Sequence, residues 1–164
     1  PPMSASPDDL FRRLQALGIE TRTYEHPPLA TVADGRRYWR DIPGGHAKNL
    51  YLRDAKKRNW LVATLFDREL EMKRLAAAIG SGRLSFGRPE RLLQYLGVAP
   101  GAVTPFAVLN DEDGQVTVVL DEALLAPSPL NFHPLVNTAT TAIRPEDLLI
   151  FLRATGHEPR ILPL

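Results

Sequence analysis

The chain has 164 residues, 44% of them apolar and 24% charged, with a net charge of +1, which fits one globular domain with a hydrophobic core. The absence of cysteine excludes disulfides, zinc–thiolate sites and cysteine nucleophiles. No apolar run approaches the roughly 20 residues of a membrane-spanning helix, and the first residues lack the order of a signal peptide. Pro1 and Pro2 precede Met3 and are interpreted as an expression remnant, so we expect a single domain over residues 3–164 with no membrane partner.

The first part of the chain carries signals for helices and strands in alternation. Ser6-Pro7-Asp8-Asp9 is typical of a helix start, because serine caps free backbone N–H groups and proline fits the first helical position. Gly18 then ends this helix. The pattern further predicts a strand over residues 19–25, a helical stretch from residue 31, strands over 48–52 and 60–64 joined by a hairpin-like connection, a helix over 67–79, a strand over 83–86 and a helix over 89–96.

The second part is richer in strand signals. The turn sequence Asp111-Glu112-Asp113-Gly114 predicts a hairpin between strands over residues 106–109 and 116–120. Residues 132–143 have threonine-rich strand character, a last helix runs from residue 145 to about 156, and a short strand covers 159–162. Short helices mixed with hairpin-spaced strands predict one α+β domain around a largely antiparallel or mixed sheet.

Charge is distributed unevenly along the chain. Residues 1–91 hold 17 of the 20 Lys/Arg and 11 of the 19 Asp/Glu residues, a net charge of +6, whereas residues 92–164 have a net charge of −5. The densest basic stretch, residues 36–58, could bind phosphates. A solvated face whose charges balance in three dimensions is an equally good interpretation.

The common catalytic signatures are missing. No Gly-x-Gly-x-x-Gly follows a strand, and Gly80-Ser81-Gly82 is too short for a phosphate loop. Neither Ser81 nor Ser85 has the glycine spacing of a nucleophile elbow. The histidines, at positions 26, 46, 133 and 157, lack metal-ligand spacing. We therefore expect no cofactor and no metal, and an enzyme without them would suit a substrate that is already activated.

Two segments contain residue types that could hold a ligand. Gly44-Gly45 leads into a strand at Lys48, whose ammonium could enter a cleft and bind a phosphate. Gly101 and Pro105 bracket a loop whose backbone amides could hold a carbonyl oxygen or a ribose hydroxyl. The alternatives are a surface lysine at a strand end and a plain connecting loop.

A third segment, residues 131–141, contains His133 followed by Pro134. Proline keeps the preceding backbone extended, which gives the imidazole a defined direction, and the threonines and alanines after it could line a tight pocket. The alternative is a buried strand in which His133 is a hydrogen-bonded core residue.

The order and spacing of these three segments resemble the YbaK / prolyl-tRNA editing family, which includes the insertion domain of bacterial prolyl-tRNA synthetase and free-standing relatives. Lys48-Asn49-Leu50 is similar to the family's lysine-centred strand, and residues 101–105 to its Gly-x-x-x-Pro loop. Phe132-His133-Pro134-Leu135 with the following Asn-Thr-Ala-Thr resembles the alanine-specific branch, ProXp-ala. The resemblance covers nearly the whole chain, although residues 36–47 depart from the pattern and His46 receives no role.

The resemblance implies a compact α+β fold with a distorted mixed sheet and a cytoplasmic deacylase that hydrolyses mischarged Ala-tRNA(Pro) in trans and spares Pro-tRNA(Pro). It would bind the acceptor end of tRNA as a monomer and meet prolyl-tRNA synthetase transiently. Other outcomes are editing of Cys-, Ser- or Thr-tRNA, a catalytically silent tRNA-binding module, or an unrelated small-molecule binding domain.

The resemblance also implies roles for particular residues. Lys48 would bind the phosphate or ribose next to the terminal adenosine, and His133 would shape the amino-acid pocket. The expected catalytic residues are Lys48, Asn49 and His133; the expected substrate-binding residues are Thr31, Ser85, Phe86, Gly101, Pro105 and Thr138; and the expected tRNA-binding residues are Arg53, Lys56, Lys57 and Arg83.

Overall fold

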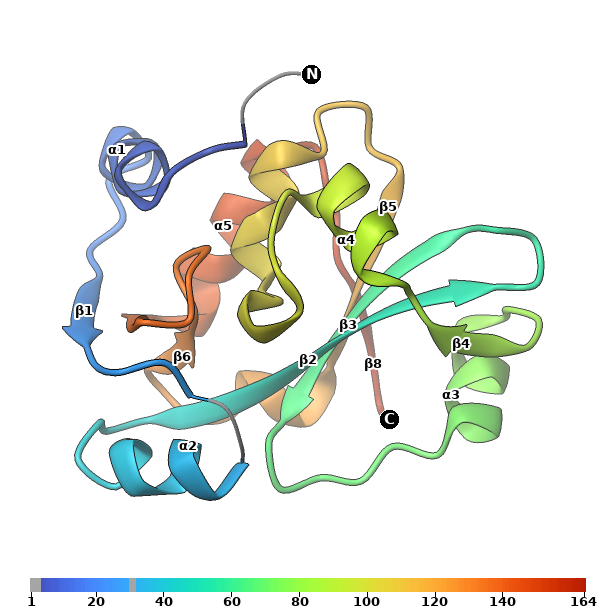
Figure 1. Ribbon diagram of the computed structural model, residues 1–164, viewed down its shortest axis with the longest axis horizontal. Helices are drawn as coiled ribbons and strands as arrows, with labels where there is room; N and C mark the ends of the chain where they lie inside the picture. The colour runs from blue at the N-terminus through green and yellow to red at the C-terminus, as the bar shows by residue number, and fades with distance from the viewer. Residues whose placement is uncertain (1–3, 30–31) are drawn as a thin grey trace.

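The protein is built on a mixed sheet of eight strands, in a computed structural model that describes residues 4–29 and 32–164 (Figure 1). The strands are β1 (Arg22–Glu25), β2 (Gly45–Asp54), β3 (Asn59–Leu65), β4 (Leu84–Phe86), β5 (Val116–Asp121), β6 (Leu130–Phe132), β7 (Ala139–Ile143) and β8 (Arg160–Leu162). Their order is β1-β7-β6-β2-β3-β5-β8, and β4 pairs with β2 beside this path. The pairs β2–β6, β3–β5 and β5–β8 are parallel and the others antiparallel. The predicted α+β class with a mixed sheet is confirmed.

Helices pack around this sheet. They are α1 (Pro7–Ala16), α2 (Val32–Trp39), α3 (Met72–Ile79), α4 (Pro89–Leu96) and α5 (Pro145–Ala154), with short 3-10 helices η1 (Pro100–Ala102), η2 (Pro105–Asn110) and η3 (Glu122–Leu125). The predicted start of α1 is confirmed: Ser6 and Asp9 form reciprocal hydrogen bonds between side chain and backbone. Within residues 4–29 and 32–164, no helix combines the length and apolar character that crossing a membrane requires.

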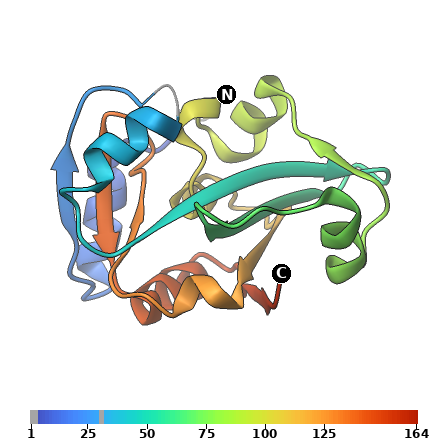
Figure 2. The same cartoon turned by 90° about the horizontal axis from the view of Figure 1, so that it is seen from below.

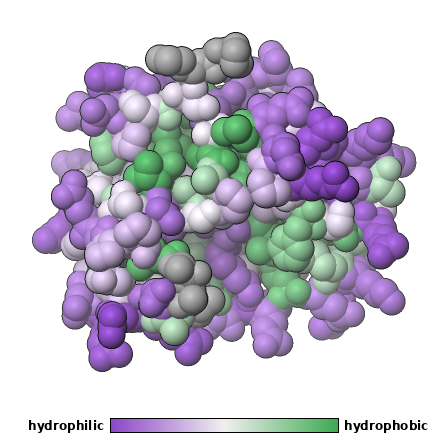
Figure 3. Space-filling view, viewed as in Figure 1, coloured by the Kyte–Doolittle hydropathy of each residue, from purple (hydrophilic) through white to green (hydrophobic). Residues whose placement is uncertain are grey.

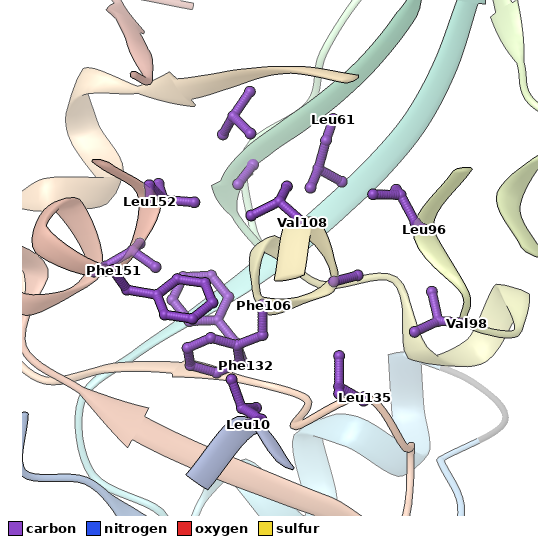
Figure 4. Close-up of a cluster of buried hydrophobic side chains, with 14 of the residues drawn as sticks. Leu10, Leu61, Leu96, Val98, Phe106, Val108, Phe132, Leu135, Phe151 and Leu152 are labelled. Carbon is purple, nitrogen blue, oxygen red and sulfur yellow. The ribbon is translucent and has the colours of Figure 1, made fainter. Parts of the chain in front are cut away.

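Two hydrophobic clusters hold these elements together. The larger one joins α1, α4, α5 and η2 to the sheet, and it centres on Phe106, which is fully buried (Figure 4). The rings of Phe132 and Phe151 meet Phe106 edge-on, with ring centroids 5.8 and 5.5 Å away. The smaller cluster packs Leu75 and Ile79 of α3 against residues of β2, β3 and β5. Because Tyr51 belongs to the larger cluster and Leu52 to the smaller one, β2 separates the two.

The predicted helix over residues 67–79 is wrong in its first turn. The helix begins only at Met72, with Glu71 as its N-cap residue. Arg68 instead reaches across to the buried carboxylate of Asp121, 3.0 Å away, and to the backbone carbonyl of Leu164. These long-range contacts keep residues 68–71 out of the helix.

The predicted hairpin around residues 111–114 is also wrong. Residues 105–110 form η2, capped by Thr104, and β5 pairs in parallel with β3 and β8. Four consecutive buried residues, 105–108, suit a helix inside the core better than a strand with one face in solvent. The turn itself exists, because the Asp111 carboxylate accepts from the N–H groups of Gln115 and Val116.

Two further strand predictions need adjustment. Residues 132–143 do not form one strand: β6 and β7 pair antiparallel and are joined by residues 133–138. Leu135 in this connection has a positive φ of 71°, which an extended strand cannot contain. The strand predicted over residues 19–25 is shorter and begins at Arg22.

Candidate active site

The edge of β2 that faces β6 and β4 is interrupted in its middle. β6 pairs with residues 45–46 at the start of β2, and β4 pairs with residues 52–54 at its end. Between them, the described part of the chain provides no strand partner for residues 47–50 on this edge. Figure 2 shows α2 beside the start of β2, next to this interruption. An open strand edge offers free backbone groups and side chains from both faces to a ligand.

A small cavity of about 20 Å³ lies at this interruption. Its walls come from α2, the start of β2, β6 with the residue that follows it, and β7. The lining residues are Trp39, His46, Ala47, Asn49, Asn131, Phe132, His133 and Thr140. Two of the three predicted catalytic residues, Asn49 and His133, therefore share one cavity.

His133 is held in a fixed orientation at this cavity. Its Nδ1 atom lies 2.9 Å from the backbone carbonyl oxygen of Ala139. Since a carbonyl only accepts, Nδ1 carries the proton and Nε2 is left unprotonated in the neutral ring. Burial lowers the pKa of His133 below its usual 6.5, with a further lowering from nearby His26, while the bond to Ala139 opposes the shift. The imidazole is therefore neutral at pH 7.

His26 connects the β1 side of the sheet to α2. Its ring stacks on Tyr38 of α2 at a centroid distance of 5.6 Å and lies 6.2 Å from the ring of His133. Its Nε2 atom is 2.8 Å from the Thr140 hydroxyl, and its backbone N–H donates to the carbonyl of Thr138. His26 thus ties α2 to the β6–β7 connection that carries His133.

The predicted glycine loop lies against the same connection. A Cβ atom on Gly101 would come within 3.0 Å of the side-chain nitrogen of Asn137, so glycine permits this close approach. Gly101 is exposed in η1, whereas Pro105 is buried in the core at the start of η2. Thr138 is exposed beside them, and its carbonyl receives the bond from His26. The structure therefore brings the Gly101 loop against the connection that carries His133.

Lys48 leaves β2 on the other face from Asn49. Side chains alternate along a strand, so Lys48 shares the face of Leu50 and Leu52, opposite Thr64 of β3 in the register. It is partly buried and forms no ion pair with the described residues. Lys48 is absent from the cavity wall, but it can approach the open edge from its own face.

Comparison with known proteins identifies the family of the chain. Residues 26–151 match the aminoacyl-tRNA editing domain. This chain belongs to the aminoacyl-tRNA editing domain family. The matched range contains Lys48, Asn49, Gly101 and His133, so the editing domain includes the whole cavity described above.

Relatives of the editing domain cover almost its full length. A "Prolyl-tRNA synthetase associated domain-containing protein 1" of Mus musculus is 42% identical over 94% of both chains. A "Prolyl-tRNA editing protein ProX" of Acetoanaerobium sticklandii is 38% identical over 94% of this chain and 95% of its own. A crystal structure provisionally described as a trans-editing enzyme for prolyl tRNA synthetase shares the fold, with a TM-score of 0.70, 23% identity and coverage of 98% and 99%.

The predicted tRNA-binding residues of the editing domain lie at the far end of β2, in and beside the β2–β3 turn. The turn carries Lys56 and Lys57 and is fixed by Asp54, whose carboxylate accepts from two backbone N–H groups of the turn. The guanidinium of Arg53 lies 5.6 Å from the centre of the Tyr95 ring. Figure 3 shows strongly hydrophilic side chains toward the right of the view, the side on which Figure 1 draws the β2–β3 turn. At about 3.3 Å per residue, the turn lies roughly 20 Å from Asn49.

Ser85 and Phe86 occupy an intermediate position. They pair with Arg53 and Leu52 of β2, so β4 holds them roughly 10 Å along the strand from Asn49. The Phe86 side chain is 65% exposed. The structure does not place these two residues at the cavity, and they lie on the route from it to the basic turn.

Several residues of the cavity have no motif that marks them. His46, Asn131 and Trp39 converge only in the fold, through the parallel pairing of β6 with the start of β2. His157, by contrast, does not line the cavity. It is buried, and its Nε2 atom lies 2.8 Å from the Asp111 carboxylate. No group of three or more His, Asp or Glu residues in the described chain could hold a metal ion.

Proposed function

We propose that this editing domain hydrolyses the ester of mischarged Ala-tRNA(Pro) in trans and spares Pro-tRNA(Pro). The observation that carries the proposal is the small cavity at the open edge of β2, lined by Asn49 and His133 within the matched editing domain. The names of the relatives, which refer to prolyl-tRNA synthetase and prolyl-tRNA editing, support proline-type tRNA as the substrate.

Size supports alanine as the amino acid removed. A synthetase pocket built for proline rejects a smaller side chain weakly, because each missing methylene group is worth only about 1–3 kcal/mol. A second site that admits the smaller residue restores fidelity. The cavity of about 20 Å³ is too small for a proline ring, and the hydrogen bond to Ala139 holds the ring of His133 at its wall.

The chemistry requires positioning more than activation of the substrate. An aminoacyl ester is already activated, so orienting it against a water molecule accounts for most of the catalysis. In this proposal the terminal ribose lies along the open edge of β2, where Lys48 reaches its phosphate and the cavity residues Asn49 and His133 meet the aminoacyl group. The exposed backbone of Gly101 supports the ester or the ribose.

Deacylation of Ala-tRNA(Pro) and Pro-tRNA(Pro) tests the proposal. The wild-type protein should hydrolyse the alanyl ester and leave the prolyl ester intact. Lys48→Ala should reduce the rate by at least about 100-fold, because it removes a charged contact at the reacting end. Lys73→Ala, which removes an exposed lysine of α3, serves as the matched control and should retain the wild-type rate. Hydrolysis of Cys-, Ser- or Thr-tRNA in place of Ala-tRNA would reject alanine, and hydrolysis of none would favour the silent binding module.

The basic turn should contribute to tRNA affinity. Exchanging Lys56 and Lys57 together for glutamate should weaken binding of uncharged tRNA(Pro) and reduce the slope of log affinity against log salt by about two, one for each lost phosphate contact. The double change of Arg12 and Arg13 to glutamate on α1 alters the net charge equally and should leave the slope unchanged. Unaltered affinity and slope in the lysine variant would exclude the turn from the tRNA interface.

A further inference from the structure

Three buried acceptors of the cavity have no hydrogen-bond partner among the described residues: Oδ1 of Asn49, Nδ1 of His46 and Oδ1 of Asn131. His46 and Asn131 stand opposite each other in the β2–β6 register. A buried acceptor without a donor destabilises a fold, so the pair suits a ligand that donates hydrogen bonds.

The orientation of both side chains is fixed by the backbone. The side-chain nitrogen of Asn131 donates to the carbonyl oxygens of Pro43 and Gly45, at 3.1 and 3.0 Å. Nε2 of His46 donates to the carbonyl oxygen of Ile42 at 2.9 Å, and the imidazole stacks on Trp39 at a centroid distance of 5.0 Å. Because carbonyls only accept, Oδ1 of Asn131 and the lone pair of Nδ1 of His46 are left for a donor.

The cavity fits a single water molecule better than a cation. A cavity needs at least roughly 10–15 Å³ to hold one water, so the volume of about 20 Å³ is enough for one. Oδ1 of Asn49 is a third acceptor without a partner among the described residues. None of the described lining residues carries a carboxylate, so an ammonium group would lose its solvent without gaining a counter-charge. A water that donates both of its protons to such acceptors directs its lone pair outward, as a nucleophile must.

We propose that Asn131 Oδ1 and His46 Nδ1 bind the water that attacks the aminoacyl ester, and that His46 accepts its proton. The inference rests on the proposed deacylase function. The water oxygen bonds to the ester carbonyl carbon while one proton moves to Nδ1. The bond from that carbon to the ribose oxygen then breaks, and His46 returns the proton to this oxygen. The amino acid leaves as a carboxylic acid that retains the second proton.

The surroundings of His46 suit a proton acceptor. Burial lowers the pKa of His46 below its usual 6.5, and the hydrogen bond to the carbonyl of Ile42 opposes this shift. The ring is thus unprotonated at Nδ1 at neutral pH. Two charged or titratable side chains lie near the His46 ring. His133 lines the same cavity. The guanidinium of Arg36 on α2 lies 5.9 Å from the centre of the Phe66 ring, which meets the His46 ring edge-on.

The test is single-turnover hydrolysis by His46→Gln. Glutamine can keep the donor to Ile42 but has no acceptor at the Nδ1 position. The rate at saturating protein should fall by about 100-fold or more, with little change in the half-saturating concentration. His157→Gln is the matched control: it removes another buried histidine, one that binds Asp111 at 2.8 Å, and should lower stability but not the rate per folded molecule.

Two substrates identify the occupant of the cavity. Lactyl-tRNA(Pro) replaces the ammonium group of the alanyl ester by a hydroxyl. If water occupies the cavity, wild type hydrolyses both esters, and His46→Gln slows both esters equally. The comparison of the two esters in the wild type needs no variant, so it tests the inference even if His46→Gln fails to fold.

Two results would overturn the inference. One is a wild-type protein that loses activity on the lactyl ester, since the cavity would then bind the ammonium. The other is a His46→Gln variant with the wild-type rate. If Ala-tRNA(Pro) itself is not hydrolysed, the proposed substrate fails, and the same comparison on whichever mischarged ester is hydrolysed still decides the role of His46.

Discussion

Alanine at position 44 should lower both the stability of the fold and the deacylation rate. Gly44 has a φ of +106°, and a Cβ atom there would lie 2.3 Å from the carbonyl oxygen of Pro129. That carbonyl also accepts the N–H of Gly45 at 2.8 Å, so it cannot move without separating β6 from β2. Strained backbone of this kind costs about 1–3 kcal/mol before the clash is included, and we expect a loss of at least about 2 kcal/mol.

Urea unfolding and single-turnover kinetics of Gly44→Ala measure the two effects separately. The β2–β6 contact aligns His46 with Asn131, so the rate per folded molecule should also fall. Gly82→Ala is the matched control: its Cβ would lie 3.5 Å from the Ala55 side chain, an ordinary contact, and its stability should stay within about 0.5 kcal/mol. A Gly44→Ala protein with the parent's stability and rate would show that β6 can shift freely.

The sequence predicted correctly those elements that are determined by interactions between residues close in sequence. α4 occupies residues 89–96 as expected, because proline fits its first turn and Gly97 ends it at a φ of +67°. The connection between β2 and β3 forms because Asp54 accepts backbone bonds from residues close in sequence. Such bonds do not depend on the rest of the fold.

Predictions failed where distant residues decide the structure. Arg68 lies outside the expected helix because it forms an ion pair with Asp121, which is distant in sequence. The sequence of residues 105–110 fits a strand as well as a helix, and only the packing of Phe106 in the core selects the helix. The parallel pairing of β5 with β3 could not be predicted from an adjacent turn, since parallel strands need a long crossover.

The same distinction applies to the candidate site. The resemblance indicated Lys48, Asn49 and His133, and the fold brings two of them to one cavity. It gave no sign of Asn131 and His46, because their importance comes from unpartnered atoms that only the completed sheet brings together. Alternation along β2 could have placed Lys48 and Asn49 on opposite faces from sequence alone.

Phe106→Ala should be the most destabilising single change in the core. Phe106 is 0% exposed and contacts the rings of Phe132 and Phe151, which join η2 to β6 and α5. Truncation of such a residue costs about 3–5 kcal/mol, or roughly 10 °C in melting temperature for a chain of this length. Phe86→Ala makes the same chemical change at a side chain that is 65% exposed, and its stability should change by at most about 0.5 kcal/mol.

The deacylation rate of the Phe106→Ala protein that remains folded tests whether this packing also affects selectivity. Phe132 immediately precedes His133, so a cavity beside its ring should loosen the wall that holds the imidazole. We therefore expect Pro-tRNA(Pro) to be hydrolysed faster than by wild type, because a looser pocket admits the larger amino acid. If the variant unfolds more readily yet still spares the prolyl ester, selectivity does not depend on rigid packing behind His133. The discrimination would then come from groups on the cavity wall itself.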